Sequence, residues 1–232
     1  MRRSLLILFV INASYTATYA QIQLSAEAGG GLSYIHHTNA PSDFSPVVKP
    51  NFAAVIDVPI ISFISLRSGI GYSPRGYNTN STIDAGPMKY EYLSSTKAHY
   101  LSIPLLLSFK LLQREDNSLW IDGGMSYNLF LAGHTNYQYN VYYNNELASK
   151  SEFSHLIIGR FGATKYSATE NTYDVNGLDV ALKLQLRYKW QDKYSLTVFY
   201  ENSLYDFRAN PDEINSTLKM RYTGVTLGYR LF

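Results

Sequence analysis

Apolar residues occupy every second position through most of the chain, which is the period of a β-strand with one apolar face. The clearest run is GLDVALKLQLRYKW (177–190), where one set of alternate positions is large and apolar and the other carries Asp, Lys, Gln and Arg. Comparable runs predict eight strands, at about 22–34, 51–58, 65–77, 101–110, 119–133, 178–190, 194–205 and 217–232. Each is long enough to supply the roughly 9–11 residues of a tilted membrane-spanning strand.

Two positions break the alternation. In the last run, Met220 and Tyr222 share one parity with Leu218, whereas Val225 and the apolar residues after it share the other. A bulge at Gly224 would reconcile them, because an extra residue flips the facing.

Pro104 lies inside HYLSIPLLLSFKLL (99–112) and cannot donate a ladder hydrogen bond. A closed barrel has no edge strand for it, so a bulge is expected there too.

The connections alternate in length. Those after the second, fourth and sixth runs are short, whereas those at about 35–46, 74–96, 133–172 and 206–215 are long and polar. Tight turns at one end and long loops at the other are typical of an outer-membrane barrel, with its turns in the periplasm. The fold class expected is therefore all-β, an eight-stranded antiparallel up-and-down transmembrane β-barrel. The segment 133–172 is expected to be the largest irregular piece, either solvated or extended as strands.

The facing of the alternation separates a membrane barrel from a soluble one. The apolar face carries large residues almost without interruption, while the opposite face combines Gly, Ala and Ser with scattered charges. Eight strands enclose only enough space for packed side chains, which suits small residues and neutralising charges. Lys or Arg facing lipid would cost about 2–4 kcal/mol each. We therefore expect the charges to form ion pairs in the lumen, and this candidate site comprises Glu27, Arg67, Asp122, Lys183, Arg187 and Glu201. Aromatic residues near the ends of the runs suit the two interfacial girdles: Tyr34, Tyr72, Tyr188, Trp190, Tyr194 and Tyr229.

Composition narrows the class further. Of 232 residues only 16% are charged and 21 are Tyr, while the net charge is +2 with no basic tract, so no nucleic-acid partner is expected. The absence of cysteine excludes disulfides and Cys-based zinc sites, and no cofactor is expected. Residues 1–20 have a basic start, an apolar run and a small-residue end, which predicts a signal peptide cleaved after Ala20 and a mature barrel over 21–232.

Four segments in this order resemble the PorT-like outer-membrane β-barrel family typical of Bacteroidota: LRSGIGYSPRGYN, HYLSIPLLLSFKL, LWIDGGMSYNLFLAG and GYRLF. The resemblance covers essentially the whole mature chain, and YLSIPLLL is its most specific part. It implies an eight-stranded barrel. A few members of the family are tied to protein secretion and gliding machinery, most have no assigned role, and no catalytic residues carry over to this sequence. The long third connection departs from the family pattern.

Three roles remain open from the sequence. The leading one is a non-enzymatic structural or interaction barrel, surrounded by outer-membrane lipid, whose extracellular loops meet a protein or glycan partner through tyrosines such as those of NYQYNVYYNN (136–145). The second is a small-solute or ion pore. The third is a lipid-modifying enzyme, since His36 and His37 lie near Ser33, Ser42 and Asp43 in the sequence. The same two histidines could in principle contact a metal, although neighbours in an extended chain point apart.

Overall fold

The computed structural model describes residues 22–37, 43–160, 175–208 and 217–232. The expected signal peptide, 1–20, lies outside these residues, as do Ser42 and part of the third connection. The described residues form strands and turns, and they contain no helix long and apolar enough to span a membrane.

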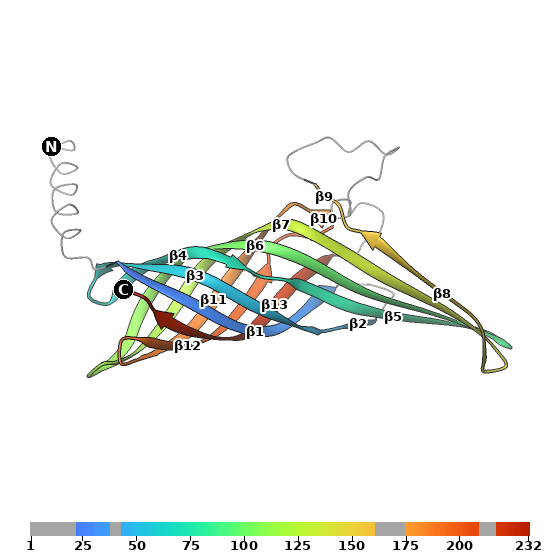
Figure 1. The fold of residues 1–232 in the computed structure, drawn as a ribbon, viewed down its shortest axis with the longest axis horizontal. Helices are drawn as coiled ribbons and strands as arrows, with labels where there is room; N and C mark the ends of the chain where they lie inside the picture. The colour runs from blue at the N-terminus through green and yellow to red at the C-terminus, as the bar shows by residue number, and fades with distance from the viewer. Residues whose placement is uncertain (1–21, 38–42, 161–174, 209–216) are drawn as a thin grey trace.

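Antiparallel strands close into a ring (Figure 1). In chain order its members are β1 (Gln23–His37), β3 (Val47–Ile61), β4 (Ile64–Tyr72), β6 (Met88–Arg114), β7 (Asn117–Tyr143), β11 (Leu178–Trp190), β12 (Tyr194–Ser203) and β13 (Leu218–Arg230). Each pairs with the next member, and β13 pairs with β1 from Ser25↔Arg230 to His37↔Leu218, which closes the ring. The predicted eight-stranded, up-and-down architecture is confirmed.

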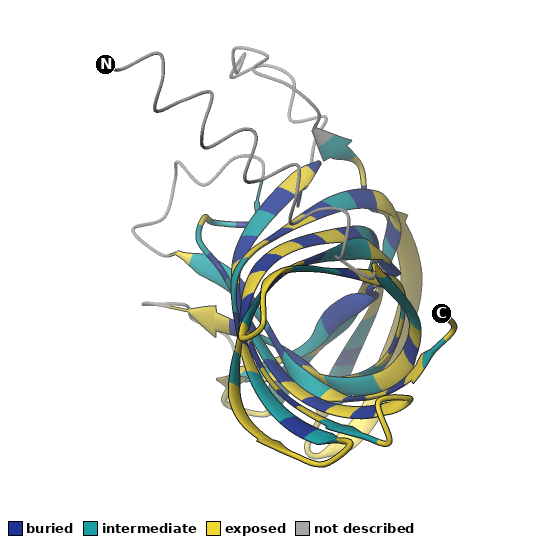
Figure 2. Ribbon diagram, turned by 90° about the vertical axis from the view of Figure 1, so that its left-hand side faces the viewer, coloured by how far each residue is buried: buried dark blue, intermediate teal, exposed yellow. Residues whose placement is uncertain are grey.

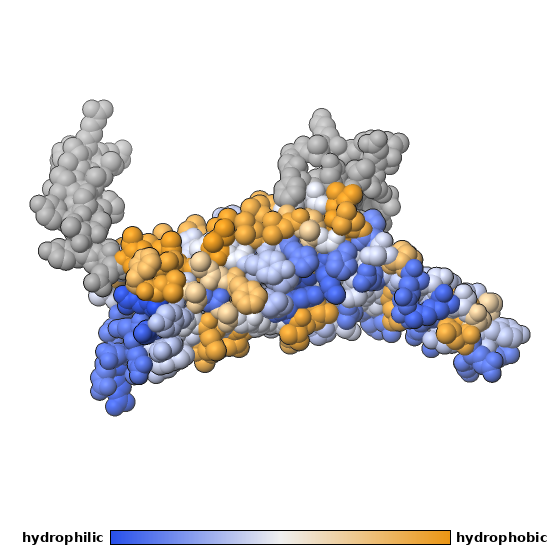
Figure 3. Space-filling model, in the orientation of Figure 1, coloured by the Kyte–Doolittle hydropathy of each residue, from blue (hydrophilic) through white to orange (hydrophobic). Residues whose placement is uncertain are grey.

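The ring has its apolar side chains outside. On β11, Leu182 and Leu184 are 39% and 47% exposed. Lys183 and Arg187, which have the opposite parity on the same strand, are only 7% and 1% exposed. Figure 2 shows the same alternation of buried and exposed residues around the whole ring. Figure 3 shows apolar side chains gathered over the barrel wall and polar ones toward both ends. The inverted facing expected of a membrane barrel is therefore present.

Short connections and both chain ends of the ring lie at one end, which we call the turn end. The turns follow β3, β6 and β11, and at two of them residues adopt the left-handed conformation: Glu115 (φ 52°), Gln191 (φ 54°) and Asp192 (φ 47°). On the outer wall at this end the rings of Tyr188, Trp190, Tyr194 and Tyr229 contact one another in sequence, with centroid separations of 5.5–6.2 Å. This is the geometry of an interfacial aromatic girdle.

At the opposite end, the hairpin end, the sheet continues far beyond the ring. β6 and β7 are 27 residues each and stay paired to Met88↔Tyr143. β5 (Arg75–Ala85) pairs with β6, β8 (Glu146–Leu156) pairs with β7, and β2 (Asp43–Ser45) pairs with β5. We call this five-stranded part the extended sheet; it forms the long projection in Figure 1. Two short strands, β9 (Gly159–Arg160) and β10 (Val175–Asn176), pair in parallel nearby.

The prediction of a loop at 74–96 is therefore wrong for most of its residues, which lie in β5 and β6. Of the two alternatives left open for 133–172, the strand extension is present in most of the described residues. Backbone pairing continues past the ring because each long strand finds a partner edge, and two tight hairpins end the projection. Gly86 (φ 65°) lies in one, and Asn144 (φ 47°) and Asn145 (φ 67°) form the other. Glycine and asparagine are the residues that tolerate this conformation in two-residue hairpins.

The expected bulge at Gly224 is absent, since β13 keeps one register with both neighbours. Met220 and Tyr222 instead face inward, with 1% and 0% exposure. These large side chains were expected to face lipid, but at the hairpin end large side chains also pack inside the lumen.

The expected bulge at Pro104 is also absent. Its pairing with Ser126 on β7 is continuous, and the β6–β7 register shifts occur at His99/Tyr100 and Lys110/Leu112. On the β4 side the ladder is unpaired between Ser68↔Leu105 and Gly71↔Ser102. The Ser68 hydroxyl donates to the Pro104 carbonyl (2.8 Å) across this gap. The missing N–H is thus accommodated by a local break in one ladder.

Candidate functional site

The lumen is filled at the turn end by a network of buried ion pairs, here called the lower charge layer: Glu27, Asp57, Arg67, Asp122, Arg187 and Lys189. Arg67 pairs with Glu27 and donates to Asp57 (2.8 Å). Arg187 donates to the same Asp57 oxygen (2.9 Å) and also to Asp122. Three carboxylates thus face three cations drawn from β1, β3, β4, β7 and β11. Their formal charges cancel, which a buried network requires.

A second network, the upper charge layer, lies toward the hairpin end: Arg75, Asp179, Lys183 and Glu201. Arg75 donates to Asp179 (3.0 Å) and pairs with Glu201, which also binds the Lys183 ammonium (2.6 Å). The Asn128 amide adds a hydrogen bond to Asp179 (3.3 Å). Two cations and two carboxylates again cancel.

Glycines make room for these layers on one side of the lumen. Gly228 lies where an added Cβ would be 2.3 Å from the Ser195 hydroxyl and 3.3 Å from Glu27 Cγ. A side chain at this position would therefore displace the Ser195 hydroxyl and press on Glu27. At Gly29, Gly31 and Gly224 an added Cβ would instead meet the backbone of the neighbouring strand at 2.0–2.3 Å, so these glycines allow β1 and β13 to approach closely.

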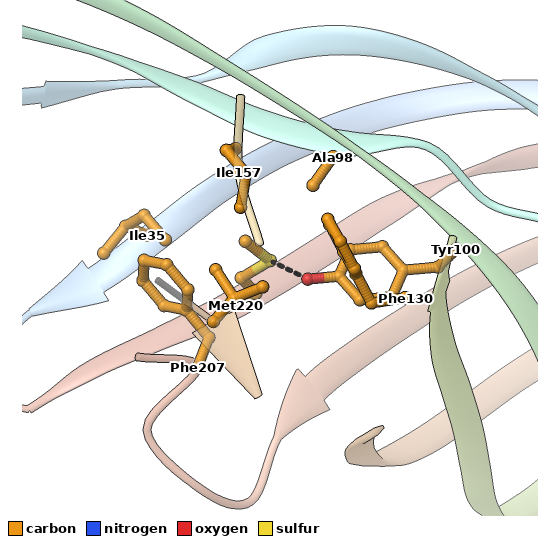
Figure 4. Close-up of a cluster of buried hydrophobic side chains, with 8 residues drawn as sticks. Ile35, Ala98, Tyr100, Phe130, Ile157, Phe207 and Met220 are labelled. Carbon is orange, nitrogen blue, oxygen red and sulfur yellow. Dashed lines mark hydrogen bonds between the residues drawn. The ribbon is translucent and has the colours of Figure 1, made fainter. Parts of the chain in front are cut away.

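Above the upper layer, apolar side chains close the lumen at the hairpin end (Figure 4). This apolar plug consists of Ile35, Ala98, Tyr100, Phe130, Ile157, Val175, Phe207 and Met220, each at most 6% exposed. Tyr100 and Phe130 meet edge to face (5.7 Å), and the Arg75 guanidinium lies 5.6 Å from the Tyr100 ring centre. The plug therefore rests directly on the upper charge layer.

Between the two layers is a cavity of about 30 Å³, lined by residues that include Glu27, Arg67 and Lys183. It holds roughly one or two waters. Charged layers below and above it, together with the plug, leave no wide passage through the described part of the lumen.

The structure brings the predicted lumen residues together in two groups: Glu27, Arg67, Asp122 and Arg187 in the lower layer, and Lys183 with Glu201 in the upper one. Sequence reasoning did not include Asp57, Asp179 and Lys189, although each has the inward parity of its strand. Arg75 follows Pro74 at the start of β5, and no alternation pattern marked it.

Outside the membrane-spanning wall, the extended sheet has two chemically different faces. One continues the lumen-facing side and carries five aromatic residues and one aliphatic residue, here called the tyrosine face: Tyr90, Tyr92, Tyr137, Tyr139, Phe153 and Ile83. Tyr92 contacts Tyr139 (4.7 Å) and Tyr137 stacks on Phe153 (4.8 Å). Tyr92 and Phe153 remain 46% and 60% exposed. An exposed aromatic cluster on a regular sheet is a typical interaction surface.

The other face continues the outer wall of the barrel and is polar. Two neighbouring rows of the ladder cross it: Ser45–Asn78–Ser95–Asn136–Ser154, and Asp43–Asn80–Leu93–Gln138–Glu152. We call it the asparagine face. A groove of about 830 Å³ runs over these rows.

The possible acyl-transfer site near His36 does not form from the described residues. Ser33 is buried and accepts a hydrogen bond from the Gly76 backbone N–H (2.9 Å), while the exposed His36 has the opposite parity on β1. Among the described residues no group of three or more His, Asp or Glu side chains is arranged so that it could hold a metal ion.

Residues 17–230 match the family model of the outer membrane protein beta-barrel domain, which agrees with this architecture. No curated protein sequence matches the chain. Among solved structures, the chain is similar to Ail, the attachment invasion locus protein of Yersinia pestis, at 10% identity and a TM-score of 0.37, over 90% of this chain and 98% of Ail. It is also similar to OprG of Pseudomonas aeruginosa, at 9% identity and a TM-score of 0.33, over 89% of this chain and 95% of OprG. With the family model covering almost its whole length, the chain belongs to the outer membrane protein beta-barrel domain family, and its location is the outer membrane.

Proposed function

We propose that this protein is a non-enzymatic binding protein of the cell surface, in which a closed barrel anchors the extended sheet and the tyrosine face binds a protein partner. The observation that carries the proposal is the pairing of a filled lumen with an exposed aromatic face outside the membrane. Outer-membrane barrels have their short turns in the periplasm, so the turn end is assigned to the periplasm and the hairpin end to the outside of the cell.

The tyrosine face has the composition of a protein-binding surface. Tyrosine supplies a large contact area with little rotamer entropy to lose, and it is enriched in the centres of interfaces. Its rings are already ordered by mutual contact, as with Tyr92 and Tyr139. The β6–β7 ladder holds them on a regular frame, which limits the ordering cost of binding.

The closed lumen argues against the pore alternative. A conducting path would have to pass two layers of mutually paired charges and the apolar plug. The narrower identification with PorT-like proteins of Bacteroidota, an accessory role in secretion, and export by a signal peptide over 1–20 are further parts of this proposal.

The decisive experiment combines two measurements on the full chain. In a planar bilayer, the purified protein should give no steady open-channel current. In intact cells, a photo-crosslinking residue at Tyr92 should give a discrete adduct with one protein, identified by mass spectrometry. The variant Tyr92→Ser/Tyr139→Ser should recover at least about tenfold less of that partner, because loss of interface hot-spot aromatics has effects of this size.

A matched control is Tyr205→Ser, since Tyr205 is 67% exposed but lies outside the extended sheet. A second variant removes the surface itself: residues 79–94 and 137–153 are each replaced by Asn-Gly, which joins Asn78 to Ser95 and Asn136 to Ser154 at register pairs. Retained heat-modifiable mobility on gels would show that the barrel still folds. Steady current, or equal partner recovery with and without the tyrosines, would contradict the proposal.

A further inference from the structure

The outer wall changes character in a fixed order as β6 leaves the membrane. Leu105, Ile103 and Leu101 follow the lipid-facing parity, His99 and Lys97 come next, and Ser95 and Leu93 follow. Positions two residues apart along a strand are separated by about 7 Å on one face. An apolar band, a basic row and a neutral polar groove therefore lie one above another on the same wall.

The basic row is built from neighbouring strands. Lys97 is the register partner of His134, and both lie one step below the groove row that contains Ser95 and Asn136. Gly76, the partner of Lys97 on β5, has no side chain. The aliphatic part of the Lys49 side chain covers Gly76 instead, since the Lys49 Cε lies 3.3 Å from the position that a Cβ on Gly76 would occupy. Next to this row, His99 is held by the Tyr72 hydroxyl (2.5 Å).

The groove above the row offers neutral hydrogen-bonding groups. Within the described part of the chain, the side chains of Asn78, Ser95, Asn136 and Ser154 have no hydrogen bond to another side chain or to the backbone. The tyrosine face of the same sheet differs, since its Thr79 and Ser94 hydroxyls bond each other (2.6 Å). Glu152, the carboxylate that lines the groove, is paired with Lys150 (2.6 Å).

We infer that this wall is a binding site for a phosphorylated glycolipid of the outer leaflet. The acyl chains of such a lipid lie on the apolar band, its phosphate meets Lys97 and His134, and its sugars enter the groove over the asparagine face. The vertical order of the three surfaces matches the order of the three parts of the ligand. Basic groups next to the hydrocarbon boundary attract anionic headgroups, and a groove of this volume is in the range of small-ligand sites. Tyr137 and Phe153 of the tyrosine face also border the groove, but Tyr92 and Tyr139 do not. This inference therefore does not rest on the two tyrosines by which the proposed function is tested.

The same barrel contains an internal comparison. On β1 and β13, His36 is the register partner of Lys219, and Arg221 lies two residues further along β13. This second basic patch is on the outer wall, but the groove residues all belong to β2 and β5–β8. This second patch therefore serves as a control: it should attract anionic lipid through its charge alone, because the groove over the asparagine face does not reach it.

The test is native mass spectrometry of the delipidated full chain in detergent micelles, titrated with bisphosphorylated lipid A carrying an inner-core oligosaccharide. Lys97→Gln should weaken binding about fivefold, the effect of one basic group near a charged headgroup. Ser95→Ala/Asn136→Ala should weaken binding of this probe but not of lipid A without sugars. Lys219→Gln and Tyr92→Ser, the two controls, should leave binding unchanged within about twofold.

Three results would overturn the inference. One is equal affinity for phosphatidylglycerol, and another is an equal loss in Lys219→Gln and Lys97→Gln; both would mean non-specific attraction. The third is binding of the free oligosaccharide as tight as that of the complete glycolipid, which would mean that the groove binds a soluble glycan and not a membrane lipid. Failure here would leave the crosslinking result at Tyr92 unaffected, so the two proposals are judged separately.

Discussion

Arg187 on β11 and Asp122 on β7 form a two-point ion pair in the lumen, with Nε–Oδ2 and Nη2–Oδ1 distances of 3.2 and 3.1 Å. They are 1% and 0% exposed. Arg187 also donates to Asp57 on β3, across the lumen (2.9 Å). One guanidinium therefore connects strands that are not neighbours in the ring, and the interior acts as a cross-brace for the wall.

Asp122→Ala should destabilise the barrel by about 3–5 kcal/mol, because it leaves Arg187 buried with one partner lost. The double change Asp122→Leu/Arg187→Met should cost much less than the sum of the two single changes, since it removes both charges. Urea unfolding in phospholipid vesicles measures both. The exposed pair Lys150–Glu152 is the control, and Glu152→Gln should change stability by less than about 1 kcal/mol. An Asp122→Ala effect no larger than that of Glu152→Gln would show that the network is not a structural brace.

The apolar plug and the two charge layers are separate obstacles along the lumen. Phe207 is a plug residue outside the strands, so shortening it removes no side chain from the ring itself. Phe207→Ala should therefore still give no steady single-channel current in planar bilayers, because both charge layers remain. A stable open current from this variant would show that the plug alone seals the barrel.

Asp206 lies beyond the hairpin end of β12 and holds the segment that carries Phe207. Burial raises the pKa of its carboxyl, but hydrogen bonds from the Arg208 side chain and from the backbone N–H groups of Leu218 and Arg208 outweigh this and lower the pKa overall. A lowered folded-state pKa means that the carboxylate stabilises this segment above the ordinary Asp value of about 3.9, and that this is lost as the pH falls through the folded pKa. A ¹³C carboxyl NMR titration in nanodiscs should give a midpoint below that value. Arg208→Gln should move it upward; a wild-type midpoint at or above the ordinary value would contradict the geometry.

The spanning wall was predictable because lipid imposes a strict rule on it. Every outward position between Leu178 and Tyr188 must be apolar, so the period of two is written into the sequence. The inward charges followed from the same parity, including Lys183 and Arg187. What parity cannot give is the partner of each charge, since Asp57 and Arg187 are 130 residues apart and meet only when the ring closes.

The extended sheet was harder to predict because water accepts polar groups on both of its faces. Tyrosine alternates with polar residues in Tyr90–Tyr92 and Tyr137–Tyr139, and this was the available signal for strands. The large inward residues Met220 and Tyr222 were misread for a related reason. Near the hairpin end the lumen is filled with apolar side chains, so hydrophobicity no longer distinguishes inside from outside.

A membrane barrel requires its aliphatic residues on the outer side of the wall, and spin-label accessibility measures this directly. A nitroxide attached through Leu184→Cys, in protein reconstituted into phospholipid bilayers, should be relaxed strongly by lipid-dissolved oxygen and hardly at all by a water-soluble nickel chelate. The opposite result, with strong relaxation by the nickel chelate and weak relaxation by oxygen, would mean that Leu184 faces water, and the membrane barrel would be contradicted.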